Sequence, residues 1–132
     1  ISQSAEFVYA LPKGIKSFVS QSGTNLSGGQ KQRLSIARAL VRQADVYIFD
    51  DSFSALDFET DSRLRKAIRE NIDATVIIVA QRVGTIMNAD KIIVLENGSI
   101  VGEGTHKELM KNCSVYKEIA LSQLSKEELK NA

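Results

Sequence analysis

The residues best suited to bind an anion lie in the stretch Asn25–Arg33, which reads Asn-Leu-Ser-Gly-Gly-Gln-Lys-Gln-Arg. Ser27, Gly28 and Gly29 stand ahead of a helical pattern that runs from residue 30 to about residue 41. Ser27 can cap that helix, and glycines let backbone N–H groups approach an anion without side chains in the way. The positive end of the helix adds to the attraction, so the pattern predicts an anion cradle. An ordinary capped helix after a turn is the alternative.

A second chemical feature is an apolar run that ends in two acids. Val46–Phe49 precedes Asp50 and Asp51, as expected of a buried parallel strand that delivers carboxylates to its C-terminal edge. Ligands of open α/β sheets gather at that edge. One acid can hold Mg²⁺, and the next can orient or deprotonate an attacking water. A strand that ends in a polar turn is the alternative, and the loop Ser54–Asp57 that follows at once argues against it.

The Asn25–Arg33 stretch, the strand that ends in Asp50 and Asp51, and the loop Ser54–Asp57 occur in the order and at the spacing seen in the ATP-binding cassette (ABC) ATPases, which they resemble. Their sequences are most similar to those of ABC exporters. The resemblance covers about residues 4–124. It implies an α/β fold: a partial P-loop NTPase core with a parallel-rich sheet flanked by helices. Residues 1–43 would be a remnant of the helical subdomain that carries the signature motif, and residues 44–132 part of the RecA-like core.

The resemblance also implies ATP and Mg²⁺ as ligands and assigns roles residue by residue. Ser27, Gly28 and Gly29 match signature residues that contact the γ-phosphate of ATP held by the opposite subunit. Asp50 matches the Walker B aspartate that supports Mg²⁺. The residues expected to contact ATP, drawn from the signature and from the D-loop at the dimer interface, are Leu26, Ser27, Gly28, Gly29, Gln30, Ser54 and Asp57.

Two catalytic positions depart from the family pattern. The residue after Walker B is normally Glu, which activates water, and here it is Asp51. Asp is one methylene shorter, which withdraws the carboxylate by about 1 Å, and a misplacement of that size can cost about 10²-fold in rate. The switch residue is normally His, and here it is Gln81, a neutral amide that can bind phosphate but cannot carry charge. Together they predict a site that turns ATP over slowly.

No Gly-x-x-x-x-Gly-Lys-Ser/Thr loop, the phosphate-wrapping P-loop, occurs in these 132 residues. Because the family places that loop upstream of the signature, we expect the chain to be the C-terminal part of a nucleotide-binding domain from a longer protein. By itself it should be inactive. Residues 19–23 occupy the place of an exporter loop that touches the membrane domain. That loop often has the sequence Gly-Glu-Arg-Gly, whereas Ser20–Gly23 reads Ser-Gln-Ser-Gly.

The departures at Asp51 and Gln81 can be interpreted from the way in which ABC cassettes pair. Cassettes work as head-to-tail pairs, with each ATP between the P-loop side of one subunit and the signature of the other. An impaired catalytic side with an intact signature resembles the weaker half of heterodimeric exporters. The expected partners are a second, different nucleotide-binding domain and the transmembrane domain of a transporter, at the cytoplasmic side of the cell membrane.

Composition is that of a globular domain, with 43% hydrophobic and 25% charged residues. The net charge of +1 and the scattered basic residues give no sign of a nucleic-acid partner. No apolar stretch approaches the roughly 20 residues of a membrane span. The lone Cys113 cannot form an internal disulfide, and we interpret it as a reduced, incidental side chain.

The remaining pattern alternates helices and strands. Asp57 should cap a helix that ends near Asn71, and the β-branched run 75–80 suits a buried central strand. Strands 91–95 and 99–101 flank the hairpin signal Glu96-Asn97-Gly98. Residues 105–108 form a capping box, a last helix spans 114–124, and the tail 125–132 is polar. His106, in the first turn of a late helix, is expected to be structural or solvated.

Two other functions remain open at this point. The chain can belong to a soluble ABC ATPase that serves DNA repair or translation, although such proteins usually carry long insertions or tandem cassettes. It can also be a non-catalytic half-domain that only dimerises or regulates. The missing P-loop keeps this second possibility open. Loss of the P-loop strand should expose a sheet edge and apolar surface, and exposed edges invite self-association.

Overall fold

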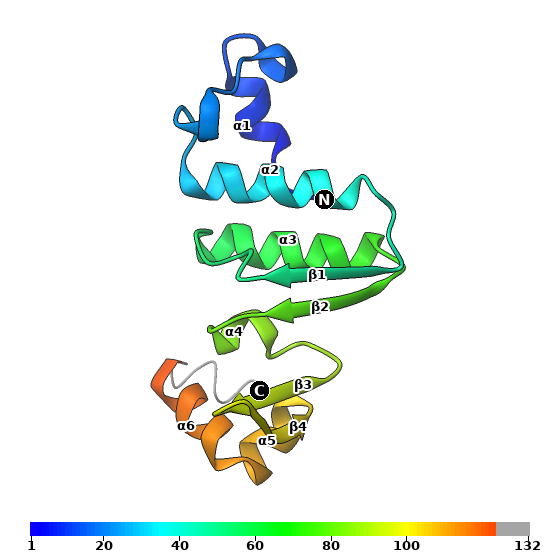
Figure 1. Ribbon diagram of the computed structural model, residues 1–132, viewed down its shortest axis with the longest axis vertical. Coiled ribbons are helices and arrows are strands. Elements are labelled where there is room, and N and C mark those ends of the chain that lie inside the picture. Colours follow the sequence, from blue (N-terminus) through cyan, green and yellow to red (C-terminus); the bar gives the residue numbers. More distant parts are fainter. Residues whose placement is uncertain (124–132) are drawn as a thin grey trace. The chain divides into compact units, whose positions relative to one another are not determined.

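The computed structural model describes residues 1–123, and the chain divides into two units, Ile1–Val79 and Ala80–Ala132. The fold is α/β, as predicted, and the described residues form one parallel and one antiparallel two-stranded sheet (Figure 1). In residues 1–123 no helix combines the length and apolarity needed to cross a membrane. The predicted tail, and Leu124 at the end of the last predicted helix, lie outside the described residues.

The first unit contains three α-helices, two 3₁₀ turns and two strands. In chain order they are α1 Ala5–Ala10, η1 Gly14–Lys16, η2 Gln21–Gly23, α2 Gly28–Leu40, β1 Val46–Asp50, α3 Phe58–Asn71 and β2 Thr75–Val79.

The described part of the second unit, residues 80–123, contains a strand hairpin and three helices. In chain order they are α4 Val83–Ile86, β3 Ile92–Glu96, β4 Ser99–Gly104, α5 His106–Asn112 and α6 Ser114–Gln123. Helix α4 and the two 3₁₀ turns were not predicted, because segments this short carry no detectable hydrophobic period.

The core of the first unit lies between the β1–β2 ladder and helices α2 and α3. The strands pair in parallel, from Val46 opposite Thr75 to Asp50 opposite Val79. Figure 1 shows α2 and α3 running beside this ladder. The buried side chains that form the core are Ile36, Tyr47, Phe49, Phe53, Leu56, Leu64 and Ile68.

The strand predicted at residues 75–80 is present as β2, but the prediction that it is a buried central strand was wrong. Every residue of β2 is exposed or half-buried, and Ile77 and Val79 are 46% and 52% exposed. In β1 only alternate residues are buried, because helices cover one face of this sheet. Val46 and Ile48 are exposed on β1, so the expected apolar surface is present.

The second unit is built on the predicted hairpin. Asn97 and Gly98 have φ of +49° and +78°, the left-handed conformation that a two-residue turn requires, and Glu96 pairs with Ser99. Strand β4 runs three residues beyond the predicted end, to Gly104, and a bulge lies between Val94 and Leu95. Helices α4, α5 and α6 complete the core, which comprises Val83, Ile92, Val94, Leu109, Cys113, Tyr116 and Ala120.

The predicted helix caps are confirmed. Ser27 and Thr105 each form a reciprocal capping box, with Gln30 and Glu108 respectively. The carboxylate of Asp57 accepts a hydrogen bond from the Thr60 N–H at 2.9 Å. A Ser or Thr cap of this kind contributes roughly 1 kcal/mol to helix stability.

Cys113 and His106 are both part of the second unit's interior. The thiol of Cys113 is free, as predicted, but it is buried against Gly102, so its packing is not incidental. His106 is structural, as predicted, and buried: its Nδ1 lies 2.7 Å from the Tyr116 hydroxyl. Burial lowers the pKa of His106, and the neighbouring Lys107 charge lowers it further. Burial also raises the pKa of Tyr116 to about 12.

Acidification should destabilise this unit through His106. In the unfolded chain His106 takes up a proton near its ordinary pKa of 6.5, whereas in the folded protein its lowered pKa keeps the ring neutral to a lower pH. The free energy of unfolding is therefore fully retained above 6.5 and falls as the pH drops below that value, by at most about 1.4 kcal/mol per pH unit. Urea unfolding from about pH 8 to pH 5 should show this slope, and His106→Phe should flatten it. Equal slopes in both proteins would contradict the assignment.

Candidate functional site

The predicted anion cradle lies at the N-terminus of α2. Ser27 Oγ accepts a hydrogen bond from the Gln30 N–H at 3.2 Å, and Gln30 Oε1 accepts one from the Ser27 N–H at 2.9 Å. This box uses two backbone donors, while the N–H groups of Gly28 and Gly29 have no partner among residues 1–123. Ser27 and Gly28 are exposed, whereas the side chain of Leu26, directly before them, is buried.

A hydrogen-bond network fixes the loop before the signature. Asn25 Oδ1 accepts hydrogen bonds from the Ser20 N–H at 3.1 Å and the Ser20 hydroxyl at 2.8 Å. Its amide nitrogen donates to the Phe18 carbonyl at 3.0 Å. Phe18 itself is 82% exposed and Val19 is 50% exposed. The loop thus presents apolar side chains on a backbone that is tied to the start of the signature.

The predicted acids lie where β1 ends, and both are exposed. The Asp51 N–H donates to the Val79 carbonyl at 3.0 Å, which continues the ladder by one bond. Asp51 then turns the chain with φ of +47°, a left-handed conformation that Asp tolerates better than most residues. The Asp51 carbonyl accepts a hydrogen bond from the Ser54 hydroxyl at 2.9 Å. This strained residue is where sequence analysis placed a catalytic carboxylate.

The signature helix packs directly on the loop that follows these acids. A Cβ on Gly29 would lie 3.0 Å from the Ala55 carbonyl oxygen and 3.5 Å from Leu56 Cδ2. A Cβ on Gly28 would meet only the Ala55 side chain, at 3.6 Å. The glycines therefore allow this contact as well as exposing backbone donors. The structure brings the signature and the Asp51–Asp57 loop together.

Asp57 closes this loop. Its exposed carboxylate caps α3, and the hydrogen bond from the Thr60 backbone N–H lowers the pKa of Asp57. The side chain is consequently ionised near neutral pH.

Gln81 belongs to the second unit, where it follows β2 and is exposed. Gln123 holds this segment at two points. Its Nε2 donates to the Gln81 carbonyl at 2.9 Å, and its Oε1 accepts from the Val83 N–H at 2.8 Å. Sequence analysis missed Gln123, because a lone Gln that pairs with residues about forty positions away leaves no local pattern.

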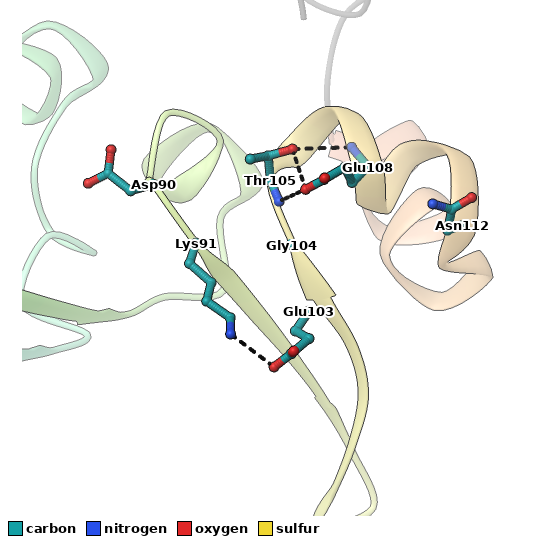
Figure 2. Close-up of a pocket in the computed structure, with 7 residues that line it drawn as sticks. All are labelled: Asp90, Lys91, Glu103, Gly104, Thr105, Glu108 and Asn112. Atoms are coloured by element: carbon teal, nitrogen blue, oxygen red, sulfur yellow. Dashed lines mark hydrogen bonds and ion pairs between the residues drawn. The ribbon is translucent and has the colours of Figure 1, made fainter.

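The second unit also has a surface pocket of about 430 Å³, lined by Asp90, Lys91, Glu103, Gly104, Thr105, Glu108 and Asn112 (Figure 2). Its contacts are structural: Lys91 pairs with Glu103 at 3.2 Å, and Glu108 is occupied by the Thr105 capping box. None of the predicted site residues lines it.

Comparison with known proteins agrees with this geometry. The sequence profile of the family described as "ABC transporter" matches residues 4–54. The chain belongs to the ATP-binding domains of ABC transporters.

Within that family the chain is homologous to exporter-type proteins. It is 50% identical over 111 residues, 83% of this chain and 19% of the relative, to an uncharacterized ABC transporter ATP-binding protein of Mycobacterium tuberculosis (strain ATCC 25618 / H37Rv). It is 42% identical over 120 residues, 90% of this chain and 20% of the relative, to the ATP-dependent lipid A-core flippase of Photobacterium profundum.

A solved structure of a bacterial Atm1-family ABC exporter with ATP bound matches 95% of this chain and 22% of its own, with a TM-score of 0.89 and 35% identity. The chain thus spans about a fifth of the length of the relatives described here.

The contact at Gly29 generates a prediction about stability. Gly29→Ala should have a free energy of unfolding lower than that of Gly28→Ala by about 1 kcal/mol or more, because the new methyl presses on the Ala55 carbonyl while the gain in helix propensity is similar at the two positions. Gly28→Ala is the matched control, since its Cβ finds ordinary contact distance. Urea unfolding of both variants measures the difference. Equal stabilities would show that the helix and the loop are not closely packed.

Proposed function

We propose that the chain is part of the ATP-binding and ATP-hydrolysing component of an ABC exporter. The observation that carries the proposal is the packing of an exposed, capped signature helix on the loop that follows Asp50 and Asp51. The kinship with exporter-type ATP-binding proteins supports it. Residues 1–43 would belong to the helical subdomain and residues 44–132 to the RecA-like core.

The signature would act on ATP held by a partner cassette. The free N–H groups of Gly28 and Gly29 can donate hydrogen bonds to terminal phosphate oxygens. Ser27 Oγ accepts its hydrogen bond from Gln30, which leaves its own O–H proton available to a phosphate. An anion would also gain from the positive end of α2. Leu26, Gln30, Ser54 and Asp57 would shape the remainder of this surface.

Mg²⁺ fits this chain through Asp50, an exposed carboxylate at the end of β1. The ion would neutralise charge on the phosphates. Residues 1–123 contain no cluster of three or more His, Cys, Asp or Glu side chains placed to hold a metal, so the other ligands would come from elsewhere, ATP included.

The chain's own catalytic side would be slow. Asp51 would orient the attacking water and accept its proton, from a carboxylate that is one methylene short of the usual Glu. Gln81 would hydrogen-bond the terminal phosphate without contributing positive charge. The chain would therefore impair its own site while it completes the site of a different, fully catalytic cassette.

The partners would be that second nucleotide-binding domain and a transmembrane domain, at the cytoplasmic side of the membrane. Val19, which is exposed, belongs to residues 19–23, the loop that the resemblance assigns to contact with the membrane domain, and the exposed Phe18 directly precedes it. Alone, the 132 residues would be inactive, because the sequence contains no P-loop. That same absence favours a second candidate function, a half-domain that dimerises or regulates without catalysis.

Restoring both family residues should accelerate hydrolysis. In the polypeptide that carries this chain, assembled with its partner, Asp51→Glu with Gln81→His should raise turnover at this chain's own site by up to about 10²-fold. Because the partner's site is already fast, kcat of the whole assembly should rise by about twofold. Asp73→Glu, the same one-methylene extension at an exposed position before β2, is the control and should leave kcat unchanged. An unchanged rate in the double variant would remove the support for an impaired site.

A further inference from the structure

Gln32, in the second turn of α2, spans the gap between the signature helix and the loop after β1. Its Oε1 accepts a hydrogen bond from the Ala55 N–H at 3.0 Å. Its Nε2 lies 3.2 Å from Ser54 Oγ and 3.4 Å from the Asp51 carbonyl oxygen, as donor to both. Both ends of one side-chain amide are therefore engaged by one loop.

The chemistry of these contacts requires an amide of this length. Only Asn and Gln carry a neutral donor and an acceptor side by side, and Asn is one methylene shorter. A Glu would keep the acceptor for Ala55 and lose the donor. A Met would fill the same volume and lose both.

The contacts converge on the residue with the strained backbone. The Ser54 hydroxyl, which Gln32 contacts, itself donates to the Asp51 carbonyl. Asp51 therefore has its N–H held by Val79 and its carbonyl held from the side of α2. A left-handed non-glycine residue persists only where its surroundings fix it, and hydrogen-bonded networks supply such rigidity.

We propose that Gln32 is a positioning residue that couples the signature helix to the carboxylate of Asp51. A displacement of α2, when its N-terminus engages phosphate in the partner's site, would be transmitted through Gln32 to the loop that carries Asp51 in the chain's own site. The proposal rests on the proposed function in assigning roles to these two ends, whereas the contacts themselves do not depend on it.

The test uses the carrying polypeptide assembled with its partner and compares Gln32→Met and Gln32→Glu with Gln43→Met, a control at an exposed position beyond the end of α2. The first readout is hydrogen exchange of the Ala55 amide. It should be faster in Gln32→Met and remain protected in Gln32→Glu, because a carboxylate still accepts the Ala55 N–H. Unchanged exchange in Gln32→Met would overturn the tether.

The second readout is ATP hydrolysis. Hydrolysis is measured in an assembly whose partner has its own catalytic side inactivated, so that only the site containing Asp51 turns over ATP. There Gln32→Met should lower kcat by on the order of tenfold or more at an unchanged KM, because a misplaced Asp51 affects the chemical step and not ATP binding. Its effect and that of Ser54→Ala should be less than additive in ln kcat, since the two side chains share one contact. Faster exchange without a fall in kcat, or fully additive effects, would overturn the coupling.

The two readouts separate the two claims. If the wild-type assembly hydrolyses no ATP, the proposed function fails, and the exchange of the Ala55 amide still decides whether Gln32 holds the loop. If hydrolysis is present, the two readouts together decide the coupling. The thermal unfolding midpoint of Gln32→Met should equal that of Gln43→Met, and a selective loss in Gln32→Met would assign the residue to stability instead of positioning.

Discussion

The close approach of a helix start to a loop backbone is the constraint on which the candidate site depends. Gly29 lies so close to this loop that a Cβ would stand 3.0 Å from the Ala55 carbonyl oxygen. That contact places the N-terminal end of α2, the proposed phosphate-binding element, against the loop that begins at Asp51. A larger residue at position 29 would press on the Ala55 carbonyl and require this loop or the helix to shift.

Around that contact, the helix N-termini are capped by side chains, and the N–H groups of Gly28 and Gly29 and the carboxylates of Asp50 and Asp51 are not used for capping. The capping box of Ser27 and Gln30 uses two backbone donors and leaves those of the two glycines to a ligand. Asp57 uses its carboxylate to start α3, while Asp50 and Asp51 are exposed at the end of β1. Kinship with ABC exporter ATP-binding proteins supports the proposal that this surface binds phosphate and that the neighbouring acids serve metal and water.

The sequence was a reliable guide where structure is decided locally, and less so where it is decided by distant partners. Caps at Ser27, Asp57 and Thr105, and the Asn97-Gly98 turn, follow from side-chain chemistry within a few residues. Burial of β2 was predicted wrongly, because an apolar strand is buried only if something covers it. The contacts of Gln32 and Gln123 were invisible, since each joins residues 19 to 42 positions apart. The residues assigned to ATP and Mg²⁺ remain proposals.

The asymmetric pairing is tested most directly by the ATPase rate of the purified polypeptide that carries this chain, measured alone and with the proposed partner, a different and fully catalytic cassette. We expect hydrolysis to appear only with the partner, because in the proposed pairing this chain would supply an intact signature and a slow catalytic side. Robust hydrolysis by the polypeptide alone would mean that Asp51 and Gln81 suffice, and would contradict the asymmetric pairing.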